Sequence, residues 1–274
     1  MDVLDRHGWT EGITILAQGR HIGFRTDKPG FLAEMRERFP PGWKPSERIK
    51  VRRVYSVRVA GQKPGPGPRK THGLYMNASR IERSRDLVYL LDRMESDLHL
   101  YVAERATRRI FVHAGVVGWK GKAIVIPGRT FTGKSTLVAE LLRLGATYYS
   151  DEYAVLDAKG RVHPFPRPIS IRSGVAQERP ARLGPEDFGA EPGRKPLPVG
   201  LVVLTRFKDG VRWRPRTVSP GRGIMALLEN TVPARRRPKA SLAALRQVVS
   251  SAPVVKGTRG EARAMAKALL GRVE

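Results

Sequence analysis

One stretch of this chain, residues 123 to 144, constrains its fold more than any other. It begins with Ala123-Ile124-Val125-Ile126, a wholly apolar run that is typical of a strand buried on both faces. Farther on, Leu137, Leu141 and Leu144 recur at helical spacing, and Gly145 follows as a helix stop. The residues between strand and helix are rich in glycine and hydroxyl groups. The stretch therefore predicts an α/β core built around a strand, a glycine loop and a helix.

The loop itself, GRTFTGKST, satisfies the pattern G-x-x-x-x-G-K-[ST]. In that pattern the glycines let successive backbone N–H groups surround phosphates, the lysine reaches the outer phosphates and the hydroxyl ligates Mg²⁺. A helix N-terminus directly after the loop also favours an anion. An ordinary glycine turn is the alternative. We predict a nucleoside triphosphate site, with ATP and Mg²⁺ as ligands and with nucleotide contacts from Gly128, Arg129, Thr130, Phe131, Thr132, Gly133, Lys134, Ser135 and Thr136.

Composition narrows the class of protein further. The chain has 274 residues and no cysteine, so disulfides, thiolate zinc sites and cysteine nucleophiles are excluded. No run approaches the ~18 apolar residues of a membrane span, and the first residues lack the apolar core of a signal peptide. We expect a cytoplasmic protein with no membrane partner.

The net charge of +26 is the unusual quantity. It is spread along the chain but weighted to the end, where residues 201–274 hold 16 lysines and arginines against 4 acidic residues. Such a surface attracts polyanions, so we expect an acidic peptide or protein partner, with nucleic acid as an alternative. A merely solvated basic surface is the third interpretation. Two clusters carry much of the charge, at 206–216 and at 235–239.

The rest of the chain divides near residue 108. We expect an N-terminal α+β region over 1–107, which could serve substrate recognition, and an ATP-binding catalytic domain over 108–274. Within the first region the sequence predicts two strands over 12–26 joined at Gln18-Gly19, a helix over 31–39 and a long helix that begins near Ser79.

An acidic pair interrupts the apolar strand predicted over 146–156. Asp151 and Glu152 stand where the crossover after the loop helix would deliver them beside the glycine loop. A site for Mg²⁺ and an attacking hydroxyl requires carboxylates there. The alternative is a pair of surface turn acids.

Four segments in order, VHAGVV (112–117), PGRTFTGKSTL (127–137), LGATYYSDEY (144–153) and PISIRSG (168–174), resemble the HPr kinase/phosphorylase family. The resemblance extends to shorter HPr-kinase-related proteins, some of which phosphorylate peptides in lasso-peptide gene clusters. It implies a P-loop kinase core shared with phosphoenolpyruvate carboxykinases. It covers residues 108–175 well and the remainder loosely or not at all.

The resemblance also implies roles for individual residues. Asp151 matches the general base, Glu152 stands where a second acid helps Ser135 to hold Mg²⁺, and His113 matches a histidine near the phosphates. A half-buried strand histidine is the alternative for His113. Arg172 matches an arginine near the transferred group, whereas Ser170 replaces the family's glutamate, which puts phosphorylase chemistry in doubt.

The sequence thus predicts a kinase that transfers the γ-phosphoryl group of ATP to a hydroxyl, chiefly a serine of a peptide or protein, and we also expect a homo-oligomer. Two other classes stay open. One is a P-loop enzyme or binding protein that acts with nucleic acid, which the run Arg235-Arg236-Arg237-Pro238-Lys239 would suit. The other is a switch that binds ATP and transfers nothing.

Overall fold

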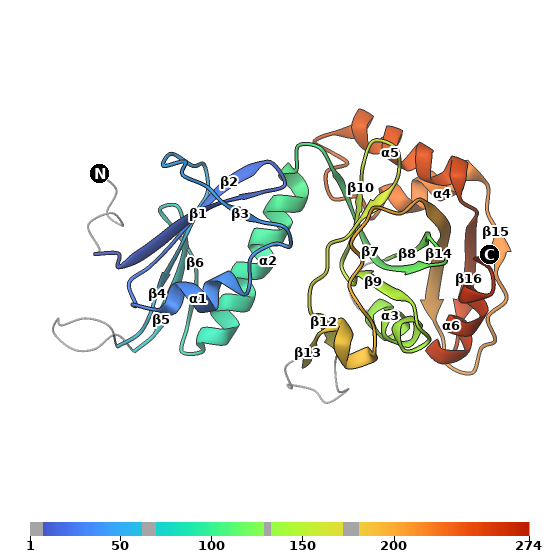
Figure 1. Cartoon of the computed structure of the whole chain (residues 1–274), viewed down its shortest axis with the longest axis horizontal. Helices are drawn as coiled ribbons and strands as arrows, with labels where there is room; N and C mark the ends of the chain where they lie inside the picture. Colours follow the sequence, from blue (N-terminus) through green and yellow to red (C-terminus); the bar gives the residue numbers. More distant parts are fainter. Residues whose placement is uncertain (1–7, 62–69, 129–132, 172–180, 274) are drawn as a thin grey trace. The chain divides into compact units, whose positions relative to one another are not determined.

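The structure of the chain is a computed structural model that describes residues 8–61, 70–128, 133–171 and 181–273. It has a mixed α/β architecture and divides into two compact units, Met1–Thr107 and Arg108–Glu274 (Figure 1). Each unit has its own sheet and its own buried core.

The first unit contains a six-stranded sheet in the order β3-β1-β2-β4-β5-β6. β1 and β2 form a hairpin whose turn residues, Gln18 and Gly19, both have positive φ, so the predicted strand pair over 12–26 is confirmed. The elements of this unit are β1 (Glu11–Ala17), β2 (Arg20–Thr26), α1 (Phe31–Arg36), β3 (Lys44–Pro45), β4 (Val54–Arg58), β5 (His72–Met76), β6 (Ser79–Ser84) and α2 (Leu87–Arg105).

The long helix of this unit starts later than the sequence predicted. Residues Ser79–Ser84 form strand β6, which pairs with β5 through a turn at Asn77, and α2 begins at Leu87 after the N-cap Asp86. The prediction of a helix from Ser79 was wrong because the hairpin with β5 overrides a local helical pattern. Apolar residues of α2, including Leu90, Met94, Leu98 and Val102, are fully buried.

The second unit is built on an eight-stranded sheet in the order β11-β10-β7-β8-β14-β16-β15, with β9 paired to β7. Its strands are β7 (Ile110–Trp119), β8 (Lys122–Pro127), β9 (Thr147–Ser150), β10 (Tyr153–Leu156), β11 (Val162–His163), β14 (Val199–Phe207), β15 (Arg216–Thr217) and β16 (Val254–Arg259). A separate two-stranded sheet joins β12 (Ile169–Ile171) to β13 (Ala181–Leu183).

Helices cover both faces of the larger sheet (Figure 1). α3 (Lys134–Arg143) and α6 (Ala262–Leu270) pack on one face, in a cluster that includes Ile126, Val203 and Val255. α4 (Pro220–Leu228) and α5 (Pro238–Ser251) pack on the other face, beside Val125 and Val202. The short 3₁₀ helix η2 (Pro185–Phe188) also contacts α3. Because alternate residues of each strand face opposite layers, strand position decides which layer a side chain enters.

The direction of the strands brings several chain segments to one edge of this sheet. β14 is parallel to both β8 and β16, and β8 and β9 are each antiparallel to β7 and therefore parallel to each other. The carboxyl ends of β8, β9, β14 and β16 thus share one edge, where ligands of open α/β sheets bind. The glycine loop follows β8 at this edge, and Asp151 follows β9.

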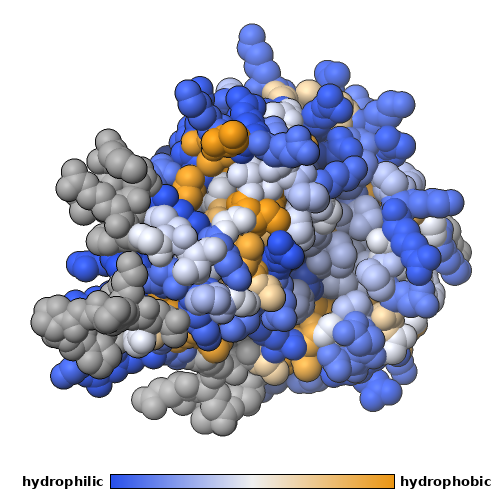
Figure 2. Space-filling view, turned by 60° about the vertical axis from the view of Figure 1, so that its left-hand side comes forward, coloured by the Kyte–Doolittle hydropathy of each residue, from blue (hydrophilic) through white to orange (hydrophobic). Residues whose placement is uncertain are grey.

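None of the helices in the described ranges combines the length and the apolar character that crossing a bilayer requires. The face drawn in Figure 2 is mostly hydrophilic, and hydrophobic residues gather there only in small separate patches.

Candidate active site

The glycine loop connects β8 to α3, so the predicted strand and helix on its two sides are confirmed. At its start, the N–H of Gly128 donates to the carbonyl of His113 at 3.1 Å. At its end, Gly133 has φ 74° and caps α3, a conformation that favours glycine. Lys134, Ser135 and Thr136 then form the first turn of the helix, where backbone N–H groups lack helical partners. Four predicted nucleotide contacts, Arg129, Thr130, Phe131 and Thr132, lie outside the described residues.

Strand register explains why Asp151 lies beside this helix. Ser150 pairs with Val116 and Tyr153 pairs with His113, so the register places Asp151 opposite Gly115. Directly opposite residues of an antiparallel pair project to the same face. A Cβ on Gly115 would lie 2.6 Å from Val138 Cγ2 of α3. The missing side chain therefore lets the first turns of α3 approach the face onto which Asp151 projects.

The surroundings of Asp151 are those of a reactive carboxyl group. It accepts hydrogen bonds from the Ser135 hydroxyl and the Ser170 backbone, and Lys134 and Arg167 act on it as nearby positive charges. Burial nevertheless dominates and raises the pKa of the Asp151 carboxyl to about 6. Its Oδ1 is buried and has no hydrogen-bond partner among the described residues. That oxygen is therefore a buried acceptor whose hydrogen-bonding capacity those residues do not use.

Two further predicted residues face the same space. Burial lowers the pKa of Lys134, and the charge of Asp151 counteracts part of that shift. Burial, together with the charge of Lys134, also lowers the pKa of His113, which keeps the imidazole neutral at pH 7. The His113 ring packs 4.8 Å from the ring of Tyr153, measured between centroids. His113 thus supports the loop through its carbonyl and presents a neutral ring near Lys134.

The second acid of the pair has a different environment. Glu152 forms an ion pair with Arg167, whose side chain is only 15% exposed, whereas the Glu152 side chain is 43% exposed. The positive charge of Arg167 also acts to lower the pKa of Asp151, so one guanidinium interacts with both acids. No cluster of three or more metal-binding side chains occurs in the parts of the chain that the structure describes. Glu152 would have to exchange Arg167 for a metal ion to act as the predicted Mg²⁺ ligand.

A buried arginine closes the other side of the loop. Arg259, the last residue of β16, is 3% exposed and donates from Nη2 to the carbonyl of Gly133 at 2.9 Å. Its Nη1 donates to the carbonyl of Gly260 at 3.1 Å, and its guanidinium lies over the aromatic ring of Phe207. Nε is buried without a hydrogen-bond partner in the described ranges. Burial lowers the pKa of this guanidinium, and Glu261 opposes the shift. Arg259 therefore places a charge directly against the end of the glycine loop.

The structure thus brings Lys134, Ser135, His113 and Asp151 near one another, and their catalytic and ligand roles stay predictions. Arg172 lies outside the described residues, and the described arginine near the acids is Arg167. Sequence analysis missed Arg167 and Arg259. Each had a signal: Arg167 stands between two prolines that hold the chain extended, and Arg259 ends a buried strand just before Gly260.

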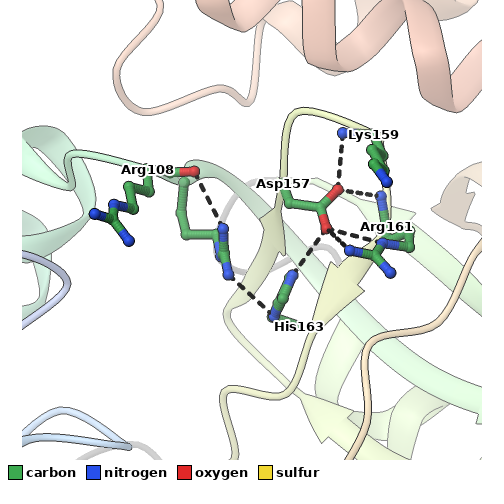
Figure 3. Close-up of polar contacts among 6 residues, drawn as sticks. Arg108, Asp157, Lys159, Arg161 and His163 are labelled. Carbon is green, nitrogen blue, oxygen red and sulfur yellow. Dashed lines mark hydrogen bonds and ion pairs between the residues drawn. The ribbon is translucent and has the colours of Figure 1, made fainter.

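A second aspartate six residues along provides a contrast with Asp151. Asp157 lies in the turn between β10 and β11 and accepts hydrogen bonds from Lys159 N, Arg161 N, Arg161 Nε and His163 Nε2, at 2.9, 3.0, 2.9 and 3.0 Å (Figure 3). Arg109 lies 3.5 Å from His163 and also donates to the carbonyl of Arg108. Each Asp157 oxygen is occupied by its own turn, so this cluster serves the hairpin.

Comparison with known proteins adds little to this geometry. No protein-family model matches the chain, and no curated protein matches it. Among solved structures, the chain is similar to the Hpr(Ser) kinase/phosphatase from Coxiella burnetii, with 16% identity and a TM-score of 0.31, over 60% of this chain and 87% of that one. A likeness at this score carries no argument, so the case for function depends on the residues themselves.

Proposed function

We propose that this protein is an ATP-dependent kinase that transfers the γ-phosphoryl group to a hydroxyl acceptor, a serine of a peptide or protein. One observation carries the proposal: the Asp151 carboxyl accepts a hydrogen bond from Ser135 at the N-terminus of α3, beside Lys134. Lysine, hydroxyl and carboxylate at the end of a glycine loop are the parts that a phosphoryl-transfer site needs. The sequence resemblance to HPr kinase/phosphorylase proteins supports the same reaction class.

The residues present fit ATP and Mg²⁺. The first-turn N–H groups of α3 and the Lys134 ammonium would hold the outer phosphates, because both present positive charge at one place. Ser135 would ligate Mg²⁺, with Glu152 as its partner once Arg167 is released. The metal ion supplies charge neutralisation between the β- and γ-phosphates. The unpartnered Oδ1 of Asp151 is an acceptor that this set leaves open.

In this proposal Asp151 handles the proton of the acceptor. The serine oxygen forms a bond to the γ-phosphorus, the bond from that phosphorus to the β–γ bridging oxygen breaks, and the hydroxyl proton moves to Asp151. A carboxyl group with a pKa of about 6 is ionised at pH 7 and still basic enough to accept that proton. Arg167, whose charge acts on Asp151, would stabilise the transferred group, and Arg259, which donates to the carbonyl of Gly133, would hold the loop. Phosphoryl transfer requires positioning and charge more than covalent chemistry from the protein.

The test is a transfer assay with γ-labelled ATP against serine-containing peptides, a protein fraction and RNA. Lys134→Ala should remove nucleotide binding and transfer, because it deletes the charge that meets the outer phosphates. The matched control is Lys267→Ala, an exposed lysine on α6, which should behave as wild type. Unchanged ATP affinity in Lys134→Ala would refute the proposed site. Label transferred to RNA, or ATP bound with no transfer to any acceptor, would instead favour the two rival classes.

A further inference from the structure

A large open cavity of about 760 Å³ adjoins the glycine loop on the α4 side of the second unit's sheet. It reaches the end of β8 at Pro127 and Gly128, and it runs along the carboxyl halves of β14 and β16. On its outer side it is bounded by Ala226 of α4 and by Glu229 and Asn230 just after it. The cavity therefore occupies the edge where ligands of such sheets bind, next to the proposed phosphate site.

Four cationic side chains line this cavity: Arg206, Arg214, Arg216 and Lys256. Glu229 is the one acid among the lining residues that the structure describes. All four cations are exposed, and within the described ranges none of them forms an ion pair. We call this group the basic cavity. Among its described lining residues, four cations thus stand against one acid.

Strand pairing shows that the cations are directed to one place. Arg216 of β15 lies directly opposite Lys256 of β16. Like charges in that position repel each other, so the pair does not serve the stability of the sheet. Lys256 lies beside Leu204, two residues before Arg206 on the same strand, so Arg206 and Lys256 project to the same face. Three of the four charges thus share one layer.

The fourth cation, Arg214, belongs to a segment that packs closely against β16. A Cβ on Gly257 would lie 2.8 Å from the Trp213 ring, and a Cβ on Gly260 would lie 2.2 Å from the Val211 carbonyl oxygen. The Trp213 contact lies on the other face of the sheet, because Trp213 packs against the cluster of α3 and α6. Arg214 itself lines the basic cavity, two residues before Arg216.

Building on the proposed function, we propose that the basic cavity binds acidic side chains that flank the acceptor serine, and that it thereby brings the hydroxyl to the proposed phosphate site. The nucleotide's own anionic part is accommodated by the helix N-terminus and Lys134, which lie on the α3 side of the loop. The base and the ribose of the nucleotide are neutral, so they do not account for the four cations of the basic cavity. Carboxylates on a peptide complement arginine and lysine side chains, and exposed charges also accelerate encounter.

The experiment measures binding separately from transfer. A fluorescent peptide with one serine flanked by glutamates is titrated with wild-type protein, and its counterpart with glutamines serves as the neutral probe. The cavity variant combines Arg206→Gln, Arg214→Gln and Arg216→Gln. The control variant removes the same charge from exposed positions outside the cavity, by Arg246→Gln, Lys267→Gln and Arg272→Gln. Unfolding midpoints verify that both variants fold.

We expect the acidic peptide to bind the cavity variant about tenfold more weakly, the control variant about as well as wild type, and ATP equally in all three. Higher salt should weaken peptide binding and leave ATP binding unchanged. Equal loss in both variants, or no binding of the acidic peptide to wild type, would overturn the proposal. If the cavity variant lost ATP binding alone, the cavity would belong to the nucleotide and the proposal would fail. It would also fail if wild-type protein preferred a single-stranded RNA over an acidic peptide of equal charge. If the acidic peptide binds the control variant better than the cavity variant but no phosphoryl transfer is detected, the cavity remains the peptide-binding site and the proposed kinase activity is refuted.

Discussion

Two aspartates six residues apart, Asp151 and Asp157, have opposite environments. Asp157 is buried and Asp151 is partly buried, and in each of them burial acts to raise the carboxyl pKa. In Asp157, hydrogen bonds from His163, Arg161 and Lys159 outweigh burial and lower the carboxyl pKa to about 2. In Asp151, the contacts from Ser135, Lys134, Arg167 and Ser170 do not outweigh burial, and the pKa rises to about 6.

The difference separates a structural carboxylate from a candidate functional one. The turn around Asp157 supplies donors from the chain's own backbone, so folding completes its hydrogen bonding. Asp151 retains a buried oxygen without a partner in the described ranges, and the protein holds it there beside Lys134. Unfavourable groups of this kind persist at sites where a ligand completes them.

The largest effect is expected from Asp151→Asn. The amide keeps the shape of the carboxyl group but cannot accept the proton of the acceptor, so transfer should fall by roughly 10²–10⁴ while ATP still binds. Single-turnover transfer of labelled phosphate, normalised to bound nucleotide, measures the change. Asp157→Asn is the matched control and should transfer at the wild-type rate per folded molecule. Transfer that survives in Asp151→Asn would reassign that residue to a structural role.

The next effect concerns pH. Because the pKa of Asp151 is raised to about 6, the base is ionised above pH 6 and protonated below it. We expect kcat/KM to be level near pH 7 and to fall about tenfold per unit below pH 6. The unfolding midpoint, recorded at each pH, shows that the protein is intact over this range. An acid limb that remains in Asp151→Asn with the same midpoint would assign the titration to another group.

Part of this contrast could be predicted from the sequence, because some of it is local. The strand, glycine loop and helix follow each other directly, and Asp151 interrupts an apolar strand, so pattern alone located both. Asp157 carries no such pattern, and its function in the turn depends on side chains of a hairpin that forms only on folding. Arg167 and Arg259 could not be predicted for the same reason. Their partners, Glu152 and Gly133, lie 15 and 126 residues away in the sequence and meet them only in the folded chain.

One wrong prediction shows where local sequence patterns fail. The residues from Ser79 were expected to begin a helix, but pairing with β5 makes them a strand. Propensity describes short segments well only where no partner strand competes for them. Around β8 and α3 the local pattern and the tertiary pairing agree, so the prediction there was confirmed.

A moderate effect on stability is expected from Asp157→Asn. The folded pKa is depressed to about 2, so the ionised carboxylate stabilises the fold above pH 4, and this contribution is lost as pH falls toward 2. The variant should lower the free energy of unfolding at pH 7 by about 1–3 kcal/mol, since charge-assisted hydrogen bonds are lost. Urea unfolding at pH 7 and pH 3 measures it, and the gap between variant and wild type should narrow at pH 3. An equal gap at both values would show that the charge of Asp157 contributes nothing.

The last effect is no larger, but it is the most specific because it has the opposite sign. The folded pKa of Asp151 is raised, so the ionised carboxyl destabilises the fold at pH 7, and this cost disappears by about pH 3, where the group is mostly protonated in both the folded and the unfolded chain. Asp151→Asn is neutral at every pH and should therefore raise the unfolding free energy at pH 7 by about 1–3 kcal/mol and leave it nearly unchanged at pH 3. Urea unfolding of wild type, Asp151→Asn and Asp157→Asn in the same buffers compares the three directly. A variant that gains stability while it loses transfer would show that the protein retains a destabilising carboxylate for its chemistry. Destabilisation by both substitutions would show that Asp151, like Asp157, is a structural acid.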